Sequence, residues 1–130
     1  MPKITLLYAA IGTFIYIFLS IFVMMGRFKF KVSVGDGGSE GMLRRVRMHA
    51  NAAEYLPLYI IMSLVIEISS GSALFLHVVG IAFMAGRVFH PFGIAKKKAP
   101  NLPRFLGINL TIWTLLAMAV YAFQLSINLL

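Results

Sequence analysis

Three polar side chains with the spacing of one helix face begin a long apolar stretch of this chain: Arg47, Asn51 and Glu54. Positions i, i+4 and i+7 lie on one side of an α-helix, and Arg44 extends the row by one turn. Where such a stretch crosses a membrane, ionisable side chains are costly and are functional by default. Arginine binds carboxylate and phosphate groups through paired hydrogen bonds, so this face predicts a site for a small anionic ligand.

Glu54 needs a cation as its partner. At a rise of about 1.5 Å per residue, Arg47 and Glu54 are roughly 10 Å apart along the helix axis, so we expect them not to pair directly. Arg87 is the expected partner, because it comes at about the same depth in a later apolar stretch. Glu54 then neutralises one arginine and leaves the other for the ligand. His90 follows Arg87 at helical spacing, although Pro91 disfavours a regular helix there.

Structural interpretations of these side chains remain open. The arginines, Asn51 and Glu54 could form a network that only holds helices together. Arg45 is expected to anchor the helix end at the membrane surface, and His49 is as much a packing or capping residue as a ligand. His77 is expected to be a core histidine, and Trp113 to contact lipid or a second subunit.

The elements that hold these residues are long apolar stretches. The sequence is 60% hydrophobic and 12% charged, whereas soluble domains average roughly 45–50% apolar and about 25% charged residues. A helix of roughly 20 mainly apolar residues crosses the bilayer core. Four stretches meet this requirement, with Glu54 as their one charged side chain: 4–25, 48–66, 68–86 and 105–130. We therefore predict an all-α chain with a single domain over residues 1–130, an integral membrane four-helix bundle.

The net charge of +8 is concentrated in two loops. Six arginine and lysine residues fall between positions 27 and 47 and five between 87 and 104, and Lys3 is the one that remains. Because basic loops stay in the cytosol, both are expected to face it and both termini to face away. This topology accounts for the charge, so no nucleic acid is predicted as a partner. Membrane lipids with anionic headgroups are an expected secondary contact.

Several kinds of site are excluded by the residue types. The chain contains no cysteine, which rules out disulfides and thiolate metal sites. His49, His90 and Glu54 lack the spacing of known zinc motifs, so no metal is predicted. Neither a Ser-His-Asp pattern nor a phosphate-binding or dinucleotide-binding glycine motif occurs.

Local signals mark the ends of the helices. FKFKVSV (28–34) alternates apolar and polar residues, which predicts an extended segment at the membrane interface. GDGG (35–38) predicts a tight turn, and Ser39 or Glu40 a helix start. Pro57 is expected to kink the second helix, and Asn101 to cap the fourth. Close helix contacts are expected at four glycines: Gly71, Gly80, Gly86 and Gly107.

Three segments of the chain, GDGG (35–38), LRRVRMHANAAEYLPL (43–58) and GRVFHPFGI (86–94), form a combined pattern. Together they resemble the MAPEG family, the membrane-associated proteins of eicosanoid and glutathione metabolism, and most closely its bacterial branch. Members are four-helix bundles that assemble as trimers, and the enzymes bind glutathione between subunits near the cytosolic face. The resemblance implies a homotrimer in a bacterial inner membrane with glutathione as co-substrate. It also implies the residues that bind this substrate: Arg47, His49, Asn51, Glu54, Arg87 and His90.

The same resemblance bears on catalysis. In the animal enzymes a tyrosine follows the arginine of the third helix by seven positions, and here that place is Ile94. An arginine near the start of the fourth helix is proposed to stabilise the thiolate, and Arg104 is the nearest candidate. A cation beside the sulfur raises the thiolate fraction, so Arg104 is the predicted catalytic residue.

The resemblance thus implies a membrane glutathione transferase or peroxidase that acts on lipophilic electrophiles. Ile94 in place of the tyrosine favours an alternative, a non-catalytic scaffold that binds a lipid or thiol ligand, so the enzymatic character stays open. A small multidrug exporter also has four helices and a membrane glutamate, but the strong charge bias of the loops argues against it.

Overall fold

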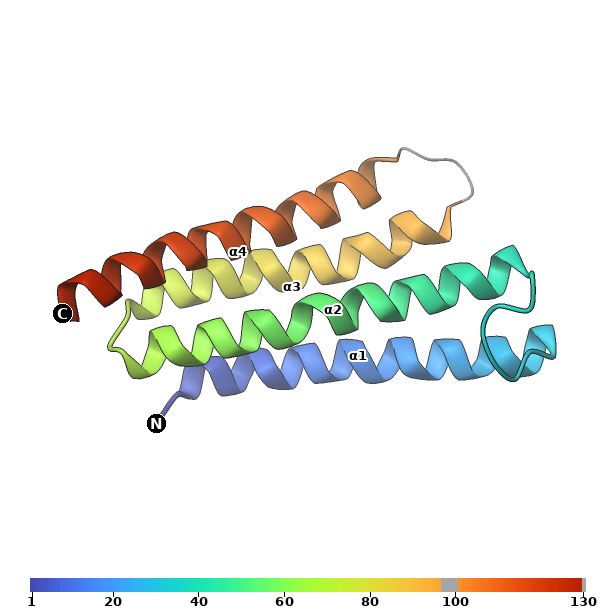
Figure 1. Ribbon diagram of the computed structural model, residues 1–130, viewed down its shortest axis with the longest axis horizontal. Coiled ribbons are helices and arrows are strands. Elements are labelled where there is room, and N and C mark those ends of the chain that lie inside the picture. Colours follow the sequence, from blue (N-terminus) through green and yellow to red (C-terminus); the bar gives the residue numbers. More distant parts are fainter. Residues whose placement is uncertain (97–100, 130) are drawn as a thin grey trace.

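The computed structural model describes residues 1–96 and 101–129 and forms four α-helices there (Figure 1). The helices are α1 (Lys3–Phe30), α2 (Glu40–Ile68), α3 (Ala73–Ala95) and α4 (Leu102–Leu129). Each is long and apolar enough to cross a membrane. They run up and down in chain order, and both termini lie at the same end of the bundle (Figure 1). The prediction of an all-α four-helix protein is confirmed.

The opposite end of the bundle, called here the basic end, carries the connection between α1 and α2, the end of α3 and the start of α4 (Figure 1). The described parts of both sequence regions that are rich in arginine and lysine map to this end, whereas Lys97 and Lys98 lie outside the described residues. Their common location agrees with the predicted topology, in which the basic end faces the cytosol.

Glycines bring α3 and α4 into backbone contact. A Cβ atom at Gly86 would lie 2.9 Å from the carbonyl oxygen of Gly107, and one at Gly107 would lie 2.6 Å from the backbone nitrogen of His90. A Cβ at Gly93 would overlap the backbone of Arg104. Small residues are the usual means of close helix contact in lipid, and the contacts expected at Gly86 and Gly107 are confirmed.

The other helix contacts combine glycine with aromatic packing. The ring of Tyr8 on α1 packs directly against Gly80 of α3, so the close contact expected at Gly80 is confirmed. Gly71 lies in the turn after α2, so the prediction that it mediates a helix contact is wrong. Between α2 and α3, the buried rings of Tyr59 and Phe83 stack with 4.2 Å between their centroids.

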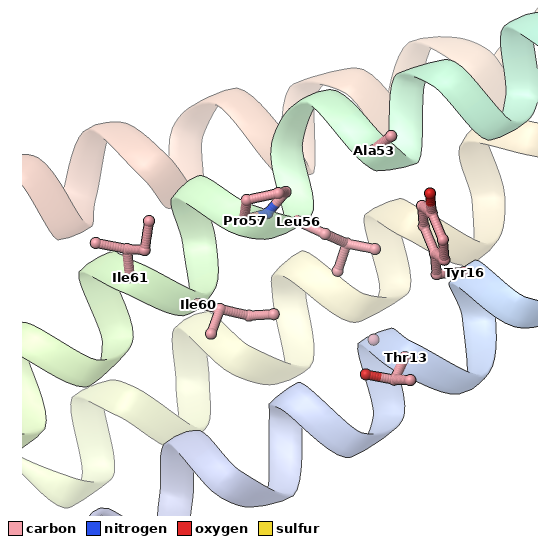
Figure 2. Close-up of a pocket in the computed structure, with 8 residues that line it drawn as sticks. Thr13, Tyr16, Ala53, Leu56, Pro57, Ile60 and Ile61 are labelled. Atoms are coloured by element: carbon pink, nitrogen blue, oxygen red, sulfur yellow. The ribbon is translucent and has the colours of Figure 1, made fainter.

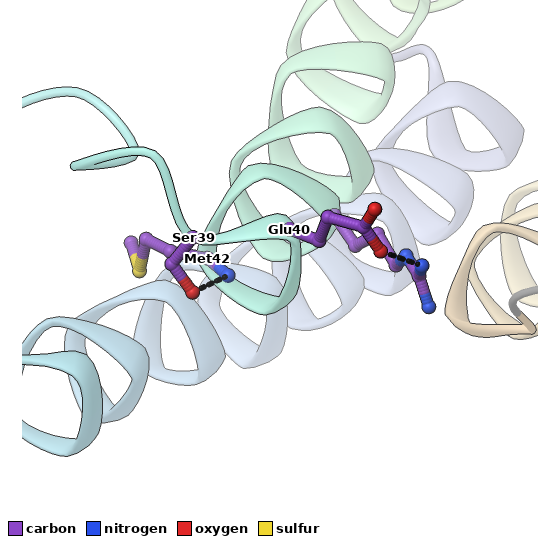
Figure 3. Close-up of polar contacts among 4 residues, drawn as sticks. Ser39, Glu40 and Met42 are labelled. Atoms are coloured by element: carbon purple, nitrogen blue, oxygen red, sulfur yellow. Dashed lines mark hydrogen bonds and ion pairs between the residues drawn. The ribbon is translucent and has the colours of Figure 1, made fainter.

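The helix starts carry the predicted caps. The hydroxyl oxygen of Ser39 accepts a backbone hydrogen bond of 3.3 Å from the first turn of α2, where Glu40 also pairs with Arg44 at 2.8 Å (Figure 3). At α4, the side-chain oxygen of Asn101 accepts from the backbone N–H of Arg104 at 3.1 Å. Both caps satisfy N–H groups that have no partner inside the helix.

The end of α1 differs from the sequence prediction. The helix continues to Phe30, and Lys31 adopts a left-handed conformation with φ 53° at its end. The prediction that 28–34 is an extended segment is therefore wrong for its first part. Phe30 packs where a Cβ at Gly41 would lie, so contact with α2 holds the last turn of α1. The GDGG turn follows as predicted, with positive φ at each of its glycines.

Two prolines lie inside continuous helices. α3 continues through Pro91 to Ala95, so the predicted irregularity at His90 is wrong. α2 likewise continues through Pro57, and the kink expected there stays a prediction. Proline removes one backbone hydrogen bond, which a membrane bundle tolerates where neighbouring groups compensate. Close packing of Gly93 on α4 fixes the turn that follows Pro91.

Polar contacts tie the helices together at the end that carries the termini. The carboxylate of Glu67 accepts hydrogen bonds from the backbone N–H groups of Ile4, at 2.9 Å, and Thr5, at 2.7 Å. The hydroxyl of Tyr8 donates to the carbonyl of His77 at 3.1 Å and lies 3.2 Å from its Nδ1. His77 is exposed, so the prediction of a core histidine is wrong.

Candidate functional site

A pocket of about 510 Å³ lies at the basic end of the bundle, between α2, α3 and α4. Four of the predicted site residues line this basic pocket: Arg47, Asn51, His90 and Arg104. Its other lining residues are Leu43, Arg44, Ile94, Lys96 and Ile108. The structure thus brings together polar side chains from two distant parts of the sequence, and their roles in binding stay predictions.

The basic pocket has an excess of positive charge. Its described lining contains three arginines and a lysine and no acidic side chain. Arg44 pairs with a glutamate of its own first turn at 2.8 Å, and Arg47 pairs with Glu54 at 3.8 Å. Within residues 1–96 and 101–129, neither Lys96 nor Arg104 forms an ion pair. Two cations are therefore left for an anionic ligand.

The predicted ion pair between Glu54 and Arg87 is wrong. Glu54 pairs with Arg47 of its own helix, and the two side chains are 53% and 57% exposed. The helical rise separates their backbones as expected, but two long side chains bridge that separation. Glu54 therefore contacts a residue of the basic pocket, Arg47, but does not line the pocket itself.

Arg87 instead connects three helices from a buried position. One terminal nitrogen donates to the side-chain oxygen of Asn51 at 2.7 Å and to its backbone carbonyl at 3.3 Å. The other donates to the hydroxyl of Thr111 on α4. The ring of Tyr55 lies 5.2 Å from the guanidinium carbon, within cation–π range. Arg87 does not line the basic pocket but contacts Asn51, which does, and its role in ligand binding stays a prediction.

Thr111 is a functional candidate that sequence reasoning missed. Its hydroxyl accepts from Arg87 and donates to the carbonyl of Gly107 at 2.9 Å. The residue is fully buried. A threonine in an apolar helix is a weak signal, because its hydroxyl can bond to the carbonyl four residues earlier.

The orientation of Asn51 follows from its partner. Arginine nitrogens only donate, so the Asn51 atom at 2.7 Å from Arg87 must be the oxygen. The Nδ2 group has no hydrogen bond to the described part of the chain. Since Asn51 lines the basic pocket, its Nδ2 group is a candidate donor for a ligand there.

His90 links the end of α3 to the start of α4. Its Nδ1 lies 3.3 Å from the backbone carbonyl of Arg104. A carbonyl only accepts, so Nδ1 carries the proton of this hydrogen bond. His90 is 6% exposed, whereas the side chain of Arg104 is exposed at the pocket.

His49 faces α1, away from the basic pocket. Its Nε2 lies 3.0 Å from the hydroxyl of Ser20, and its ring centroid lies 4.6 Å from that of Tyr16. These contacts support the packing interpretation of His49. Arg45 faces α1 as well. Its guanidinium donates to the backbone carbonyl of Phe22 at 2.7 Å, and its guanidinium carbon lies 3.8 Å from the centroid of the Phe22 ring. Arg45 therefore packs on α1 in addition to any role as a surface anchor.

Two further pockets flank α1 and are mainly apolar. One of about 440 Å³ lies between α1 and α2 and is lined by Thr13, Tyr16 and Pro57 together with aliphatic side chains (Figure 2). The other, of about 500 Å³, lies mainly between α1 and α3. Its lining includes four phenylalanines, other apolar residues and Arg87. Such surfaces suit lipid chains or lipophilic ligands. Neither of these pockets shares a lining residue with the basic pocket.

Four membrane-length helices with a basic pocket near one end define a small multi-pass membrane protein. Comparison with known proteins narrows this class. The MAPEG family model matches residues 5–124. Inner membrane protein YecN of Escherichia coli K12 is 32% identical over 90 residues, 69% of each chain, and YecN of Escherichia coli O6:H1 gives the same values. The chain belongs to the MAPEG family, and the predictions of this family and of a multi-pass bacterial inner-membrane protein are confirmed.

Proposed function

We propose that the protein is a glutathione-dependent transferase or peroxidase of the membrane that acts on lipophilic electrophiles. Membership of the MAPEG family supports glutathione as the co-substrate. The observation that carries the proposal is the basic pocket, in which Lys96 and Arg104 have no acidic partner in the described chain. Its volume of about 510 Å³ lies within the roughly 300–1,000 Å³ of small-molecule sites.

The charges of glutathione match the groups around the pocket. The tripeptide carries two carboxylates, which Arg47 and Lys96 bind, so that Arg104 stays free for the sulfur. The Nδ2 group of Asn51 donates a further hydrogen bond to one of these carboxylates. The ammonium group of glutathione binds Glu54, whose pair with Arg47 is long, at 3.8 Å, and open to exchange.

The chemistry of the proposed reaction rests on Arg104. A guanidinium beside the glutathione sulfur stabilises the thiolate, which is the nucleophilic form. The thiolate attacks an electrophilic carbon, a carbon–sulfur bond forms, and the leaving group departs with the electron pair of its bond. The second substrate reaches the sulfur from the bilayer, which dissolves lipophilic electrophiles.

We also propose a homotrimer in which glutathione lies between neighbouring copies. Arg47 and Glu54 are more than half exposed in the single chain. Exposed charges at membrane depth are costly unless protein or a water-filled cavity surrounds them. A neighbouring copy packed against α2 would enclose this pair and close the pocket.

Two measurements on the detergent-purified protein test the proposed function. Isothermal calorimetry measures the binding of glutathione, and conjugation of 1-chloro-2,4-dinitrobenzene measures transfer. We expect Arg104→Ala to lower the conjugation rate about a hundredfold, the size of effect that loss of one charge-stabilising group has elsewhere. Lys3→Ala, at the opposite end of the chain, is the matched control. No conjugation by the wild type would contradict a transferase, and equal rates for Arg104→Ala and wild type would contradict the role of Arg104.

A non-catalytic scaffold is the second candidate function, and Ile94 is the observation that favours it. Ile94 lines the basic pocket together with Ile108, so apolar surface lies beside the cations. That combination also suits an amphiphile with an anionic head and a lipid chain. Native mass spectrometry would then detect a retained lipid. Turnover of any hydroperoxide with glutathione would exclude the scaffold.

A further inference from the structure

His90 is the histidine of this chain that lies at the basic pocket. The sequence contains three histidines. His49 is hydrogen-bonded to Ser20 on the face of α2 toward α1. His77 contacts Tyr8 at the end that carries the termini. His90 alone among them lines the pocket where the proposed function places glutathione.

The hydrogen bond to Arg104 determines the tautomer of His90. Nδ1 donates to the Arg104 carbonyl, so in the neutral ring Nε2 holds the lone pair. Nε2 has no hydrogen-bond partner within the described residues. The ring is therefore fixed at one nitrogen and free to accept a proton at the other.

No other described side chain of the pocket can accept a proton in this way. Arginine and protonated lysine have donors and no lone pair, and the amide of Asn51 is not basic. The remaining lining residues are aliphatic. Ile94 supplies no acid or base at the position of the family tyrosine. Among the described side chains that line the pocket, His90 is therefore the one that can take the proton of a bound thiol.

We propose, on the basis of the proposed function, that His90 is the general base that accepts the thiol proton of glutathione at Nε2. The S–H bond breaks, the proton binds Nε2, and the sulfur keeps the electron pair. Arg104 holds the resulting thiolate until that pair forms the bond to the electrophilic carbon. The proton then leaves the imidazolium for water at the open side of the pocket.

The packing of α3 on α4 places the base and the cation together. His90 is hydrogen-bonded to the backbone of Arg104. The absence of a side chain at Gly107 allows the backbone of His90 to approach α4, since a Cβ there would lie 2.6 Å from its nitrogen. Gly93, one turn further on, packs on the backbone of Arg104 itself. The backbones of the two residues therefore meet in one close contact between α3 and α4.

His90→Asn separates catalysis by Nε2 from the structural role of Nδ1. The asparagine amide reaches about as far as Nδ1 and can still donate to the Arg104 carbonyl, but it has no base at the place of Nε2. We expect glutathione to bind this variant with a Kd within about twofold of wild type. We expect kcat at neutral pH to fall about a hundredfold, within the range for loss of a general base. At alkaline pH the rate should recover, because glutathione then ionises without help.

The controls distinguish this inference from the proposed function. His77→Asn, far from the pocket, should leave kcat unchanged. His90→Ala should weaken binding as well, since it removes the contact with α4. The ultraviolet absorbance of the thiolate is a second readout that needs no electrophile. Glutathione bound to wild type should show it at neutral pH, and glutathione bound to His90→Asn should show less of it.

Three outcomes decide between the role of His90 as a base and the proposed function as a whole. If His90→Asn matched wild type in activity or in thiolate absorbance, the role of His90 would be overturned and the proposed function would stay intact. A uniform loss of kcat in His90→Asn at every pH would also overturn it, because a structural defect is not repaired by alkali. Failure of wild type to bind glutathione would overturn the proposed function and the base together.

Discussion

Arg87 on α3 donates a hydrogen bond of 2.7 Å to the side-chain oxygen of Asn51 on α2, and it does so while only 1% exposed. Within the described residues no carboxylate pairs with this arginine. A buried charge without an opposite charge costs free energy, which hydrogen bonds to Asn51 and Thr111 offset in part. The arrangement fixes the direction of the Asn51 amide and is not primarily a source of stability.

Arg87→Met should therefore affect binding more than folding. Methionine fills a similar space without charge, and replacing a buried ion by an apolar residue is often neutral or stabilising. Without Arg87 the Asn51 amide can rotate, so we expect the Kd for glutathione to rise about tenfold, or about 1.4 kcal/mol. Calorimetry and thermal unfolding in detergent measure the two effects. An unchanged Kd would show that Asn51 does not need Arg87.

Arg87→Ala is the comparison for that variant. It removes the same hydrogen bonds and also leaves a cavity, for which we expect a loss of about 2–5 kcal/mol in stability. Arg87→Met and Arg87→Ala should thus differ in melting temperature and agree in the weakening of glutathione binding.

Glu54→Gln should weaken the binding of glutathione and strengthen the binding of a dicarboxylate that has no ammonium group. The pair of Arg47 and Glu54 is half exposed, so its loss should lower stability by less than about 1 kcal/mol. Glutathione loses the partner of its ammonium group, and its Kd should rise. A dicarboxylate without an ammonium group, such as succinate, should bind more tightly because Arg47 is no longer neutralised. Calorimetric Kd values that move in the same direction for both ligands would contradict the assigned role of Glu54.

The sequence predicted the helices well because membrane spans depend on length and hydropathy alone. Helical spacing also placed Arg47 and Asn51 on one face, and both line the basic pocket. The ion pair of Glu54 was not predictable from backbone rise, since the reach of long side chains adds to it. Likewise, His49 is two residues from Arg47 and contacts α1, because the rotation of a helix about its axis is set by its neighbours.

Contacts between distant segments were the least predictable part of the fold. Arg87 and Thr111 are joined across two helices, and neither residue type identifies the other. The alternating pattern of 28–34 failed for the same reason, because packing of Phe30 on α2 outweighed a short local periodicity. Sequence patterns predict which helix faces are polar, whereas three-dimensional packing determines which helix faces contact one another.

Gly107→Ala should separate α3 from α4. The new methyl group would lie 2.6 Å from the backbone nitrogen of His90, and backbone atoms cannot move aside without shifting a helix. We expect a loss of about 1–3 kcal/mol, as for other overpacked sites, measured as a lower melting temperature. Ala119→Val adds volume on the exposed face of α4 and is the control. Equal melting temperatures for Gly107→Ala and wild type would contradict the close contact.

Glu67→Ala should loosen the start of α1. Its carboxylate accepts from the N–H groups of Ile4 and Thr5, which have no partner inside their own helix. Loss of such a cap costs about 1 kcal/mol, and we expect a matching fall in melting temperature. Hydrogen exchange should rise at the first turn of α1 and stay unchanged at its last turn. Glu67→Gln keeps one acceptor oxygen, so its melting temperature and exchange rates should lie between those of wild type and Glu67→Ala. Unaltered exchange at Ile4 and Thr5 would contradict the cap.

The unpaired cations of the basic pocket predict that binding depends on salt. The Debye length falls from about 30 Å at 0.01 M to about 3 Å at 1 M salt, so the attraction of Lys96 and Arg104 for an anion weakens over this range. We expect the Kd for glutathione to rise steadily with salt in calorimetric titrations. Arg104→Gln should lower the slope of log Kd against log salt, whereas Lys3→Gln should leave it unchanged. A slope that Arg104→Gln does not alter would place the anion away from Arg104.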